Sequence, residues 1–333
     1  MSELRKLTMV GAINAALAAA LESDPKSLIM GEDVGQLGGV FRVTDGLAAR
    51  FGTDRVVDTP LAEAGIVGSA IGLALGGYRP VVEIQFDGFV FPAFNQITTQ
   101  LAKLHQRLGG AQQVPVTIRI PFGGGIGAVE HHSESPEVYF MHTPGLRVVT
   151  PASVQDAFTM TYLAIASPDP VIVFEPKVRY WDKAEIDVSL PDTSEAGLLE
   201  LHKARVVRPG TDVTVVAYGP TVRTALSAAQ VLAEEGKEVE VIDLRSLSPL
   251  DLPTVVASAR KTGRVVVVHE ASTFCGPGAE IAAAVSEAAF EYLYAPVARV
   301  GGFHTPYPPA MLEQRWLPNL DRVLEAIDRT LAR

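Results

Sequence analysis

The stretch from residue 213 to residue 269 reads VTVVAYGPTVRTALSAAQVLAEEGKEVEVIDLRSLSPLDLPTVVASARKTGRVVVVH. It contains three short runs rich in β-branched residues, at positions 213–218, 239–244 and 264–269. A helical pattern over 221–235, closed by Gly236, separates the first two runs. Strands joined through a helix pair in parallel, because the chain crosses back over the sheet before the next strand starts. This stretch therefore predicts a compact βαβ domain.

The same alternation occurs in the first half of the chain. Runs rich in β-branched residues at 81–86, 116–120, 147–150 and 171–174 alternate with helical patterns. The alternation breaks between Pro176 and Gly210, where charged and polar residues dominate. We therefore predict an α/β protein of two domains with mainly parallel sheets: a first domain over residues 1–185, a linker over 186–208 and a second domain over 209–333.

The composition excludes several classes of protein. Of the 333 residues, 47% are hydrophobic and 20% are charged, which is the balance of a folded globular protein. The 28 basic and 38 acidic residues give a net charge of −10, which argues against a general nucleic-acid binder. The single cysteine, Cys275, rules out an intramolecular disulfide and is typical of a reducing compartment.

Two apolar stretches bear on export and membrane binding. Residues 1–21 are alanine-rich but contain Glu3 and Asn14 and lack a small-residue cleavage pattern, so they predict a helix and not a secretory signal. Residues 64–78 are the most apolar stretch, but glycines interrupt it and it is shorter than the roughly 20 residues of a membrane-spanning helix. We expect a soluble, cytoplasmic protein with no membrane association.

A glycine-rich helix follows Thr59 and Pro60, which can serve as its N-cap and first-turn residue. Glu63 then falls in the first turn, where a carboxylate is favoured by the helix dipole alone. Its apolar neighbours suggest a second role, that of an acid shielded from water that can donate a hydrogen bond. Four glycines share one helix face, so we expect a buried helix that pairs closely with another helix at a subunit interface: Gly65, Gly68, Gly72 and Gly76.

Six ordered segments between residues 31 and 149 resemble the beta subunits of pyruvate and branched-chain 2-oxo acid dehydrogenases, and the resemblance extends over nearly the whole chain. They are GEDVG (31–35), DTPLAE (58–63), EIQF (83–86), PFGGG (121–125), HSES (132–135) and PGLRVV (144–149). The resemblance implies a pyrimidine-binding thiamine diphosphate fold followed by a transketolase C-terminal-like domain. It also implies the activity of the family's E1 component, which oxidatively decarboxylates a 2-oxo acid and reductively acylates a lipoyl group.

The resemblance also implies roles for individual residues. Glu63 matches the glutamate that hydrogen-bonds N1′ of the cofactor's aminopyrimidine ring. Phe89 matches an aromatic residue beside that ring, often tyrosine in branched-chain relatives, and Leu61 and Gln85 match positions near it. Without the resemblance Phe89 would be taken for an ordinary core residue, and Leu61 and Gln85 are equally compatible with a core or strand-end role. His132 matches the histidine that orients the lipoyl group and supplies a proton to it, which an imidazole near neutral pH can do.

Other motifs have weaker interpretations. Metal binding is an alternative interpretation of His131, His132 and His142, but no carboxylate or cysteine pattern accompanies them, so proton transfer ranks above metal binding. The glycines of residues 123–127 lack the lysine and hydroxyl of a phosphate loop and predict a flexible turn near the cofactor or near His132. His269 and Glu270 are interpreted as a strand end and not as an acid–base pair.

A magnesium motif is missing from the sequence. Thiamine enzymes of this superfamily hold Mg²⁺ with a Gly-Asp-Gly segment and an asparagine about thirty residues later. The closest match here is Thr44-Asp45-Gly46, which lacks the first glycine and is not followed by a suitable asparagine. The resemblance therefore implies that an alpha subunit holds the diphosphate and Mg²⁺ in an α2β2 heterotetramer. It further implies that the second domain docks the dihydrolipoyl acyltransferase, and that potassium lies near Thr117 and Asp169.

Several alternatives remain open. Residues 132–137 look closer to branched-chain enzymes, which favours 3-methyl-2-oxobutanoate as substrate, while pyruvate and acetoin dehydrogenases share the other motifs. A transketolase-like enzyme acting on sugar phosphates is a further candidate, although a one-chain enzyme would need the missing magnesium motif. A noncatalytic α/β binding protein is the alternative outside the enzymes, and it would tolerate loss of Glu63 and His132.

Overall fold

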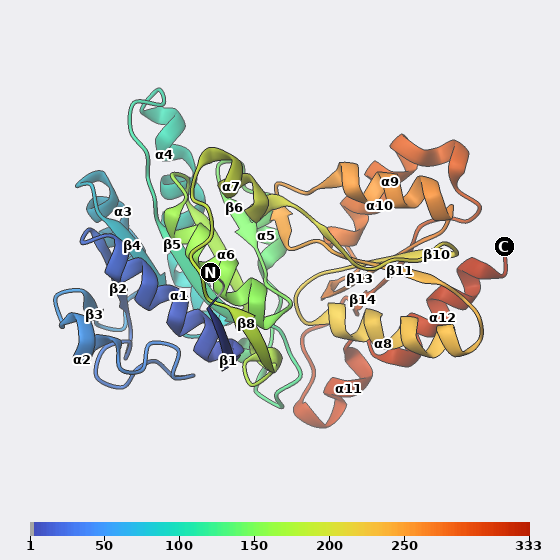
Figure 1. Ribbon diagram of the computed structural model, residues 1–333, viewed down its shortest axis with the longest axis horizontal. Helices are drawn as coiled ribbons and strands as arrows, with labels where there is room; N and C mark the ends of the chain where they lie inside the picture. The colour runs from blue at the N-terminus through green and yellow to red at the C-terminus, as the bar shows by residue number, and fades with distance from the viewer. Residues whose placement is uncertain (1–2) are drawn as a thin grey trace.

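The computed structural model describes residues 3–333, which form two lobes that lie side by side (Figure 1). The first lobe is built on a seven-stranded sheet with the order β12-β6-β7-β5-β4-β2-β3. All neighbours in it pair in parallel except β12 with β6. Its strands are β2 (Ser27–Gly31), β3 (Val56–Asp58), β4 (Arg79–Glu83), β5 (Thr117–Phe122), β6 (Arg147–Val149), β7 (Val171–Pro176) and β12 (Ser246–Ser248).

The central strands of this sheet are apolar on both faces. Every residue of β5 and β7 is buried, which is the pattern of a parallel sheet with helices on each side. The four runs expected as strands correspond to β4, β5, β6 and β7, so that prediction is confirmed. The helices of the lobe are α1 (Met9–Ser23), α2 (Leu47–Phe51), α3 (Glu63–Leu75), α4 (Ala102–Arg107), α5 (Glu137–Met141) and α6 (Val154–Ala166), with the short helical segments η1 (Asp87–Ala93), η2 (Gln96–Leu101), η3 (Glu130–His132) and η4 (Lys177–Arg179).

The second lobe has a five-stranded sheet with the order β14-β13-β10-β11-β9, in which only β9 is antiparallel to its neighbour. The strands are β9 (Arg205–Arg208), β10 (Val213–Ala217), β11 (Val239–Asp243), β13 (Val265–Ser272) and β14 (Ala298–Gly302). In Figure 1, α9 and α10 cover one face of this sheet, and α8 and α12 cover the other. The helices are α8 (Thr221–Glu234), α9 (Leu252–Thr262), α10 (Pro277–Ala289), α11 (Glu313–Trp316) and α12 (Leu320–Leu331), with η6 (Phe290–Tyr292) and η7 (Ala310–Leu312).

The parallel βαβ arrangement predicted from residues 213–269 is confirmed by β10, α8, β11 and β13. Helix α9 lies between β11 and β13 and was not predicted. Its signals are nevertheless local: Asp251 caps the first turn by accepting a hydrogen bond from Thr254 N at 3.4 Å, and Gly263 ends the helix at φ 66°.

The chain between the lobes is structured. It contains β8 (Lys183–Asp187), α7 (Glu195–Leu199), η5 (Glu200–His202) and β9. Strand β8 pairs with β1 (Leu4–Thr8) in a two-stranded antiparallel sheet, and β9 belongs to the second sheet. The domain limits 1–185, 186–208 and 209–333 stay a prediction; residues 1 and 2 lie outside the described part of the chain. The helix expected over 1–21 is partly wrong, since β1 comes first and α1 is capped by Thr8.

Helix α3 starts later than predicted. Thr59 is not its N-cap: the helix begins at Glu63, after Ala62, which makes no side-chain capping bond. Thr59 instead extends the edge of the sheet, its N–H donating to Gly31 O at 2.9 Å. The expectation of a helix buried all round is also wrong for the single chain, because a Cβ placed on Gly68 or Gly72 would meet no atom within 4 Å. Close pairing of this glycine face with another helix stays a prediction.

Among residues 3–333 no helix is both long enough and apolar enough to cross a membrane.

Candidate active site

The predicted site lies at the carboxyl edge of the first sheet. Gly31 of β2 pairs in register with Asp58 of β3 on one side and with Glu83 of β4 on the other. The segments that follow these three strands therefore leave the sheet at the same level. Ligands of parallel α/β sheets bind at this edge, where the loops after neighbouring strands diverge.

Two carboxyl groups lie next to each other at this edge. Glu63, the first residue of α3, and Glu32, just after β2, are each only 7% exposed. Burial raises the pKa of Glu32, and the nearby charges of Glu63 and Asp33 raise this pKa further. Among the described residues no hydrogen bond joins the carboxyl group of Glu63 to another group, and Glu32 Oε1 and Thr59 Oγ1 are buried without a partner. Buried polar atoms without partners are rare in folded proteins.

Gln85, which lies just after β4, supports this pair. Its Nε2 donates to Asp33 Oδ2 at 3.1 Å and to Glu32 O at 3.4 Å, so it holds the turn that carries Glu32. Asp33 has φ 60°, which places this turn in a left-handed conformation. Leu61, by contrast, is 79% exposed. The structure thus brings Glu63 and Gln85 together through Glu32, while Leu61 projects from the surface of the chain.

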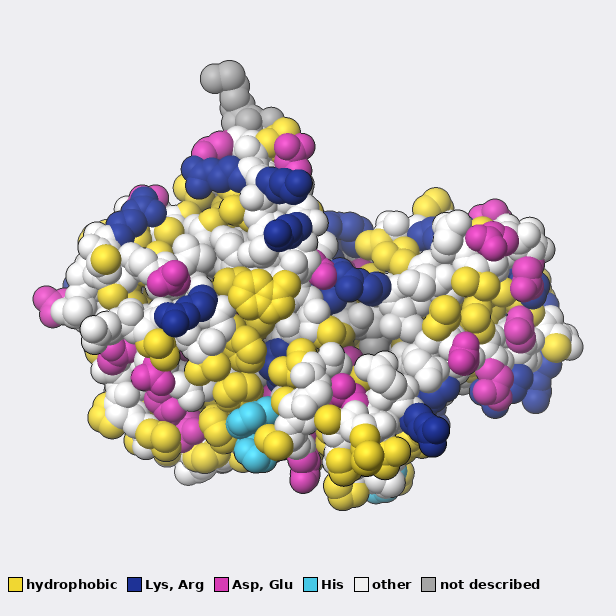
Figure 2. All heavy atoms as spheres, turned by 90° about the horizontal axis from the view of Figure 1, so that it is seen from below, with side chains coloured by type: hydrophobic (Ala, Val, Ile, Leu, Met, Phe, Trp, Pro, Cys, Tyr) yellow, Lys and Arg dark blue, Asp and Glu magenta, His cyan; other side chains and the backbone are white. Residues whose placement is uncertain are grey.

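An aromatic cluster lies beside these groups. The ring of His132 stacks on Phe86, with centroids 3.8 Å apart and planes inclined by 18°. Phe89 packs edge-on, with its centroid 5.1 Å from that of His132 and 5.8 Å from that of Phe86. Phe89 and His132, which lie 43 positions apart in the sequence, are therefore in one cluster. In Figure 2 histidine side chains reach the surface among hydrophobic ones, on the face seen from below.

His132 has a defined tautomer in this geometry. Its Nδ1 lies 2.9 Å from the carbonyl oxygen of His131, and only a protonated Nδ1 can donate to a carbonyl. Burial lowers the pKa of His132, and the neighbouring His131 and Lys177 charges lower this pKa further. The imidazole is therefore neutral at pH 7, and Nε2 is the atom that can take up or return a proton.

A buried ion pair fixes the segment that follows His132. Lys177 Nζ contacts Asp87 Oδ1, and both side chains are fully buried. The second oxygen of Asp87 accepts a hydrogen bond from the N–H of Glu134. Burial raises the pKa of Asp87 to about 6, although Lys177 opposes that rise. This pair therefore ties the segment after His132 to η1 and η4.

A second buried network lies below the site. Arg119 of β5 is completely buried and binds Glu83 Oε2 through Nη1 at 2.6 Å. Its Nε and Nη2 bind the two carboxylate oxygens of Glu175 at 2.7 and 2.9 Å, a bidentate arrangement. Tyr180 adds a hydrogen bond to Glu175 at 2.6 Å. These contacts lock β4, β5 and β7 together directly beneath the residues of the site.

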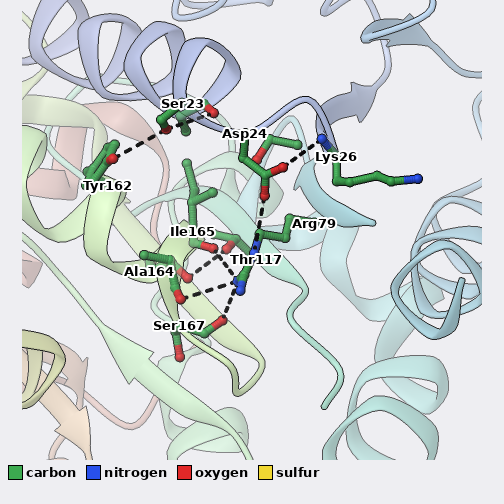
Figure 3. A network of polar contacts seen from close by, with 12 residues as sticks. Ser23, Asp24, Lys26, Arg79, Thr117, Tyr162, Ala164, Ile165 and Ser167 are labelled. Carbon is green, nitrogen blue, oxygen red and sulfur yellow. Dashed lines mark hydrogen bonds and ion pairs between the residues drawn. The ribbon is translucent and has the colours of Figure 1, made fainter. Parts of the chain in front are cut away.

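Thr117 and Asp169, the residues near which potassium was predicted, lie at the opposite edge of the sheet, where β5 and β7 begin. Thr117 Oγ1 donates to Ala164 O at 3.1 Å, and Asp169 Oδ2 accepts from Arg147 at 2.8 Å. Figure 3 shows that the end of α6 faces a side chain from β4. Nη1 of Arg79 donates to the carbonyl oxygens of residues 165, 166 and 167 at 3.2, 3.3 and 3.2 Å. The potassium prediction is untested, but a guanidinium already satisfies these carbonyls.

The histidines do not form a metal centre of the usual kind. Within residues 3–333 no group of three or more histidine, cysteine, aspartate or glutamate side chains is placed to hold a metal ion. The glycines at 123–127 lie in an irregular segment after β5, and the flexibility expected of them stays a prediction. Two residues of the site were not singled out from the sequence: Glu32 and Phe86. Both lie inside motifs that carried the resemblance and shortly after a strand, β2 for Glu32 and β4 for Phe86, and this position was the available signal.

Comparison with known families gives two matches. Residues 5–181 match the model described as the transketolase pyrimidine binding domain, and residues 202–323 match the transketolase C-terminal domain. A solved structure titled "Split gene transketolase, inactive beta4 tetramer" superimposes with a TM-score of 0.76 and 25% sequence identity, covering 98% of each chain. The two lobes thus have the architecture of the transketolase-like folds.

Comparison with individual proteins gives close relatives over the full length. The pyruvate dehydrogenase E1 component subunit beta of Leifsonia xyli subsp. xyli is 60% identical, over 99% of this chain and 96% of that protein. The 3-methyl-2-oxobutanoate dehydrogenase subunit beta of Mycobacterium tuberculosis is 53% identical, over 98% of this chain and 92% of that protein. The pyruvate dehydrogenase E1 component subunit beta of Staphylococcus epidermidis is 46% identical, over 98% and 99% respectively.

Proposed function

The chain belongs to the E1 beta subunits of the 2-oxo acid dehydrogenases, and from this membership we propose that Glu63 and its neighbours bind the aminopyrimidine half of thiamine diphosphate. The protein is one subunit of an enzyme, and it works together with an alpha subunit and the dihydrolipoyl acyltransferase of the same complex. The observation that carries the proposal is the pair Glu63 and Glu32, both buried at the carboxyl edge of the sheet, with Glu32 Oε1 left without a hydrogen-bond partner.

The residues at this edge fit a flat, nitrogen-containing ring. Phe86 and Phe89 offer aromatic surface, and the carboxyl of Glu63 can share a proton with a ring nitrogen. Glu32 Oε1 and Thr59 Oγ1 have unused hydrogen-bonding capacity. When bound, thiamine diphosphate supplies an electron sink for the loss of carbon dioxide from a 2-oxo acid.

The chain's own residues contribute three actions in this proposal. Glu63 holds a proton at its carboxyl group and exchanges it with ring atom N1′ of the aminopyrimidine. Gln85 fixes the turn that carries Glu32. Phe89 excludes water from the aminopyrimidine ring, and Leu61 does the same once a partner subunit covers it. His132, held by its Nδ1 bond, exchanges a proton through Nε2 during transfer to the lipoyl group.

The partner proposal goes further than the family assignment. We propose that the alpha subunit holds the diphosphate and Mg²⁺, in an α2β2 heterotetramer, and that the second lobe docks the dihydrolipoyl acyltransferase with its lipoyl domain. The exposure of Leu61 beside the buried Glu63 supports a covering subunit at this place. Cys275, the single cysteine and a free one, is compatible with the reducing cytoplasm in which we expect the complex.

The proposed substrate is a branched-chain 2-oxo acid such as 3-methyl-2-oxobutanoate. The sequence HSESPE of residues 132–137 and the 53% identical relative support it. Pyruvate is the second candidate, because the 60% identical relative is a pyruvate dehydrogenase subunit. Side-chain selectivity of this kind is worth about 1 to 3 kcal/mol per methylene group, so the two substrates are readily separated by kinetics.

The test is reconstitution. The purified chain is mixed with its alpha subunit, thiamine diphosphate and Mg²⁺, and kcat/KM is measured for 3-methyl-2-oxobutanoate and for pyruvate with an artificial electron acceptor. We expect activity only with both subunits, and a higher kcat/KM for the branched-chain acid. Activity of the chain alone on sugar phosphates would favour the transketolase-like alternative. No activity in the mixture, with intact assembly, would favour a noncatalytic binding protein.

A further inference from the structure

The loop that carries His132 is closed at its base and lies between the two lobes. We call residues 123–134 the histidine loop. The N–H of Gly123 donates to Glu134 O at 2.9 Å, so the two ends of the loop are adjacent. Asp87 holds the Glu134 end from the first lobe, as described above. The Gly123 end needs a separate support, because its glycines favour no single conformation by themselves.

The second lobe supplies that support with two carboxylates. Glu270, at the end of β13, accepts a hydrogen bond from Gly124 N at 2.9 Å. Glu313, at the start of α11, accepts from Gly125 N at 2.9 Å through Oε1 and from Gly127 N at 3.2 Å through Oε2. Three backbone N–H groups of the histidine loop are therefore bound by carboxyl groups of the other lobe. Burial raises the pKa of Glu270 to about 7, so its bond to Gly124 is charge-assisted, and therefore stronger, only while this carboxyl group is ionised.

Tyr307 completes the arrangement. Its hydroxyl donates to Glu313 Oε1 at 2.6 Å, and its ring packs on Trp316 with centroids 4.8 Å apart. Glu270, Tyr307 and Glu313 are 6%, 6% and 4% exposed, so the contacts lie away from bulk water, where such bonds cost most to lose.

The glycines of the loop are explained by these contacts. A Cβ on Gly124 would lie 1.9 Å from Tyr307 Oη, and a Cβ on Gly123 would lie 2.7 Å from Glu270 Oε2. Gly124 has no left-handed φ, so its lack of a side chain is required by Tyr307 and not by its own backbone. The glycine run is therefore a docking surface for side chains of the second lobe.

We propose that Glu313, Tyr307 and Glu270 are positioning residues for His132, which hold the histidine loop in the shape that stacks His132 on Phe86. This inference rests on the proposed function of His132 in transfer to the lipoyl group. It gives the second lobe a part in the reaction in addition to assembly. The residues act through the loop backbone and touch neither the predicted cofactor site nor the ring of His132.

The experiment uses the reconstituted complex and separates the two half-reactions. Decarboxylation is measured with an artificial electron acceptor, and reductive acylation is measured with the free lipoyl domain. Tyr307→Phe removes only the hydroxyl, and Glu313→Gln removes the charge while keeping the shape of the side chain. We expect kcat for reductive acylation to fall about 10- to 100-fold in Glu313→Gln and less in Tyr307→Phe, with KM for the lipoyl domain and the rate of decarboxylation nearly unchanged. Glu291→Gln, an exposed carboxylate of the same lobe, is the matched control.

A second pair of variants guards against loss of folding. Gly124→Ala should reduce reductive acylation because its Cβ meets the Tyr307 hydroxyl, and Gly124→Ala combined with Tyr307→Ala should recover part of that loss. Circular dichroism melting and hydrogen exchange of residues 123–134 report folding and loop order separately. Faster exchange in this loop, with an unchanged melting temperature, is the expected result for Glu313→Gln.

His132→Ala in the same assays distinguishes the two ways to be wrong. If His132→Ala leaves reductive acylation intact, the proposed role of His132 fails, whatever the other variants do. If His132→Ala impairs it while Glu313→Gln and Gly124→Ala do not, the positioning inference is overturned and the proposed function stands. An equal loss in both half-reactions for Glu313→Gln would also overturn it, because that result indicates general damage.

Discussion

The sheet edge around Glu63 and the histidine loop differ in how many of their polar groups have hydrogen-bond partners within the chain. At the edge, Glu32 Oε1 and Thr59 Oγ1 are buried without partners, and Leu61 next to them is exposed. In the histidine loop, the backbone N–H groups of Gly123, Gly124, Gly125 and Gly127 all have acceptors within the chain, and Ser133 Oγ is its buried side-chain atom without a partner.

This difference shows which parts of the site are complete in one chain. A buried hydroxyl or carboxyl without a partner destabilises the fold, so the edge is built for groups that another molecule brings. The histidine loop is held by its own chain, and we infer that it needs no partner to take its shape. The following predictions test this contrast, from the largest expected effect to the smallest.

The first prediction concerns the incomplete edge. Glu63→Gln should lower decarboxylation by the reconstituted enzyme by at least about 100-fold, because an amide cannot exchange a proton with the ring. Steady-state turnover with an artificial acceptor measures the effect. Glu280→Gln is the matched control, since Glu280 is also in the first turn of a 13-residue helix but is exposed. Equal effects of the two variants would mean that Glu63 acts only as a favourable charge at the start of a helix and has no role in proton exchange.

The second prediction concerns the complete loop. His132→Ala should lower reductive acylation of the lipoyl domain about 10- to 100-fold and decarboxylation much less, because the ring exchanges a proton only in the second half-reaction. Single-turnover acylation and acceptor-linked decarboxylation provide the two rates. His142→Ala, an exposed histidine on the same lobe, should leave both unchanged. Parallel losses in the two assays would contradict this assignment.

The third prediction tests an exception to the contrast. Glu137 is buried where the lobes meet, with Tyr218 donating to Oε1 at 2.7 Å and Oε2 without a partner. Burial raises the pKa of Glu137 to about 7, so the folded state binds its proton more tightly than the unfolded state does, and stability falls as pH rises from about 4.5 to 7. Glu137→Gln should remove this fall, a gain of roughly 3 kcal/mol at pH 8 relative to pH 4.5. Urea unfolding across this pH range measures it, and parallel pH profiles for the two proteins would refute it.

The fourth prediction concerns the opposite edge of the sheet, where Arg79 satisfies the carbonyls at the end of α6. Arg79→Met should destabilise the fold by about 1 to 2 kcal/mol, while Arg329→Met, an exposed last-turn arginine of α12, should change it little. Denaturant midpoints in potassium and in choline provide a second comparison. A potassium-dependent midpoint in the parent protein would support the predicted ion near Thr117 and Asp169, and equal midpoints in the two salts would count against it.

Local patterns predicted the elements well and the long-range contacts poorly. Strand and helix order followed from runs such as 171–174, because a parallel strand buried on both faces is apolar throughout. The predicted start of α3 was wrong because Thr59 has the residue type of an N-cap. In the structure Thr59 continues the sheet edge, where its N–H donates to Gly31 O, and the helix begins only at Glu63. Motif resemblance pointed to Glu63 and His132.

The supports of the site were beyond prediction from local sequence. Glu270 and Glu313 bind a loop that precedes them by 146 and 188 positions, and no local pattern encodes such a distance. From the sequence, His269 and Glu270 were interpreted only as a strand end. Both residues do lie near the end of β13, but the hydrogen bond from the histidine loop to Glu270 was not predicted. Unpartnered atoms such as Thr59 Oγ1 likewise become visible only when burial is known.

The crossing strand β12 makes the two lobes inseparable. It follows β11 of the second lobe but pairs with β6 at the border of the first sheet, Ser246 opposite Val149. A chain cut at residue 208 would leave β6 with a bare row of backbone donors and acceptors, the kind of surface that recruits other strands and leads to aggregation. The gene segment for the first lobe is therefore a poor candidate for independent expression or for exchange between proteins, even though the lobe has its own core.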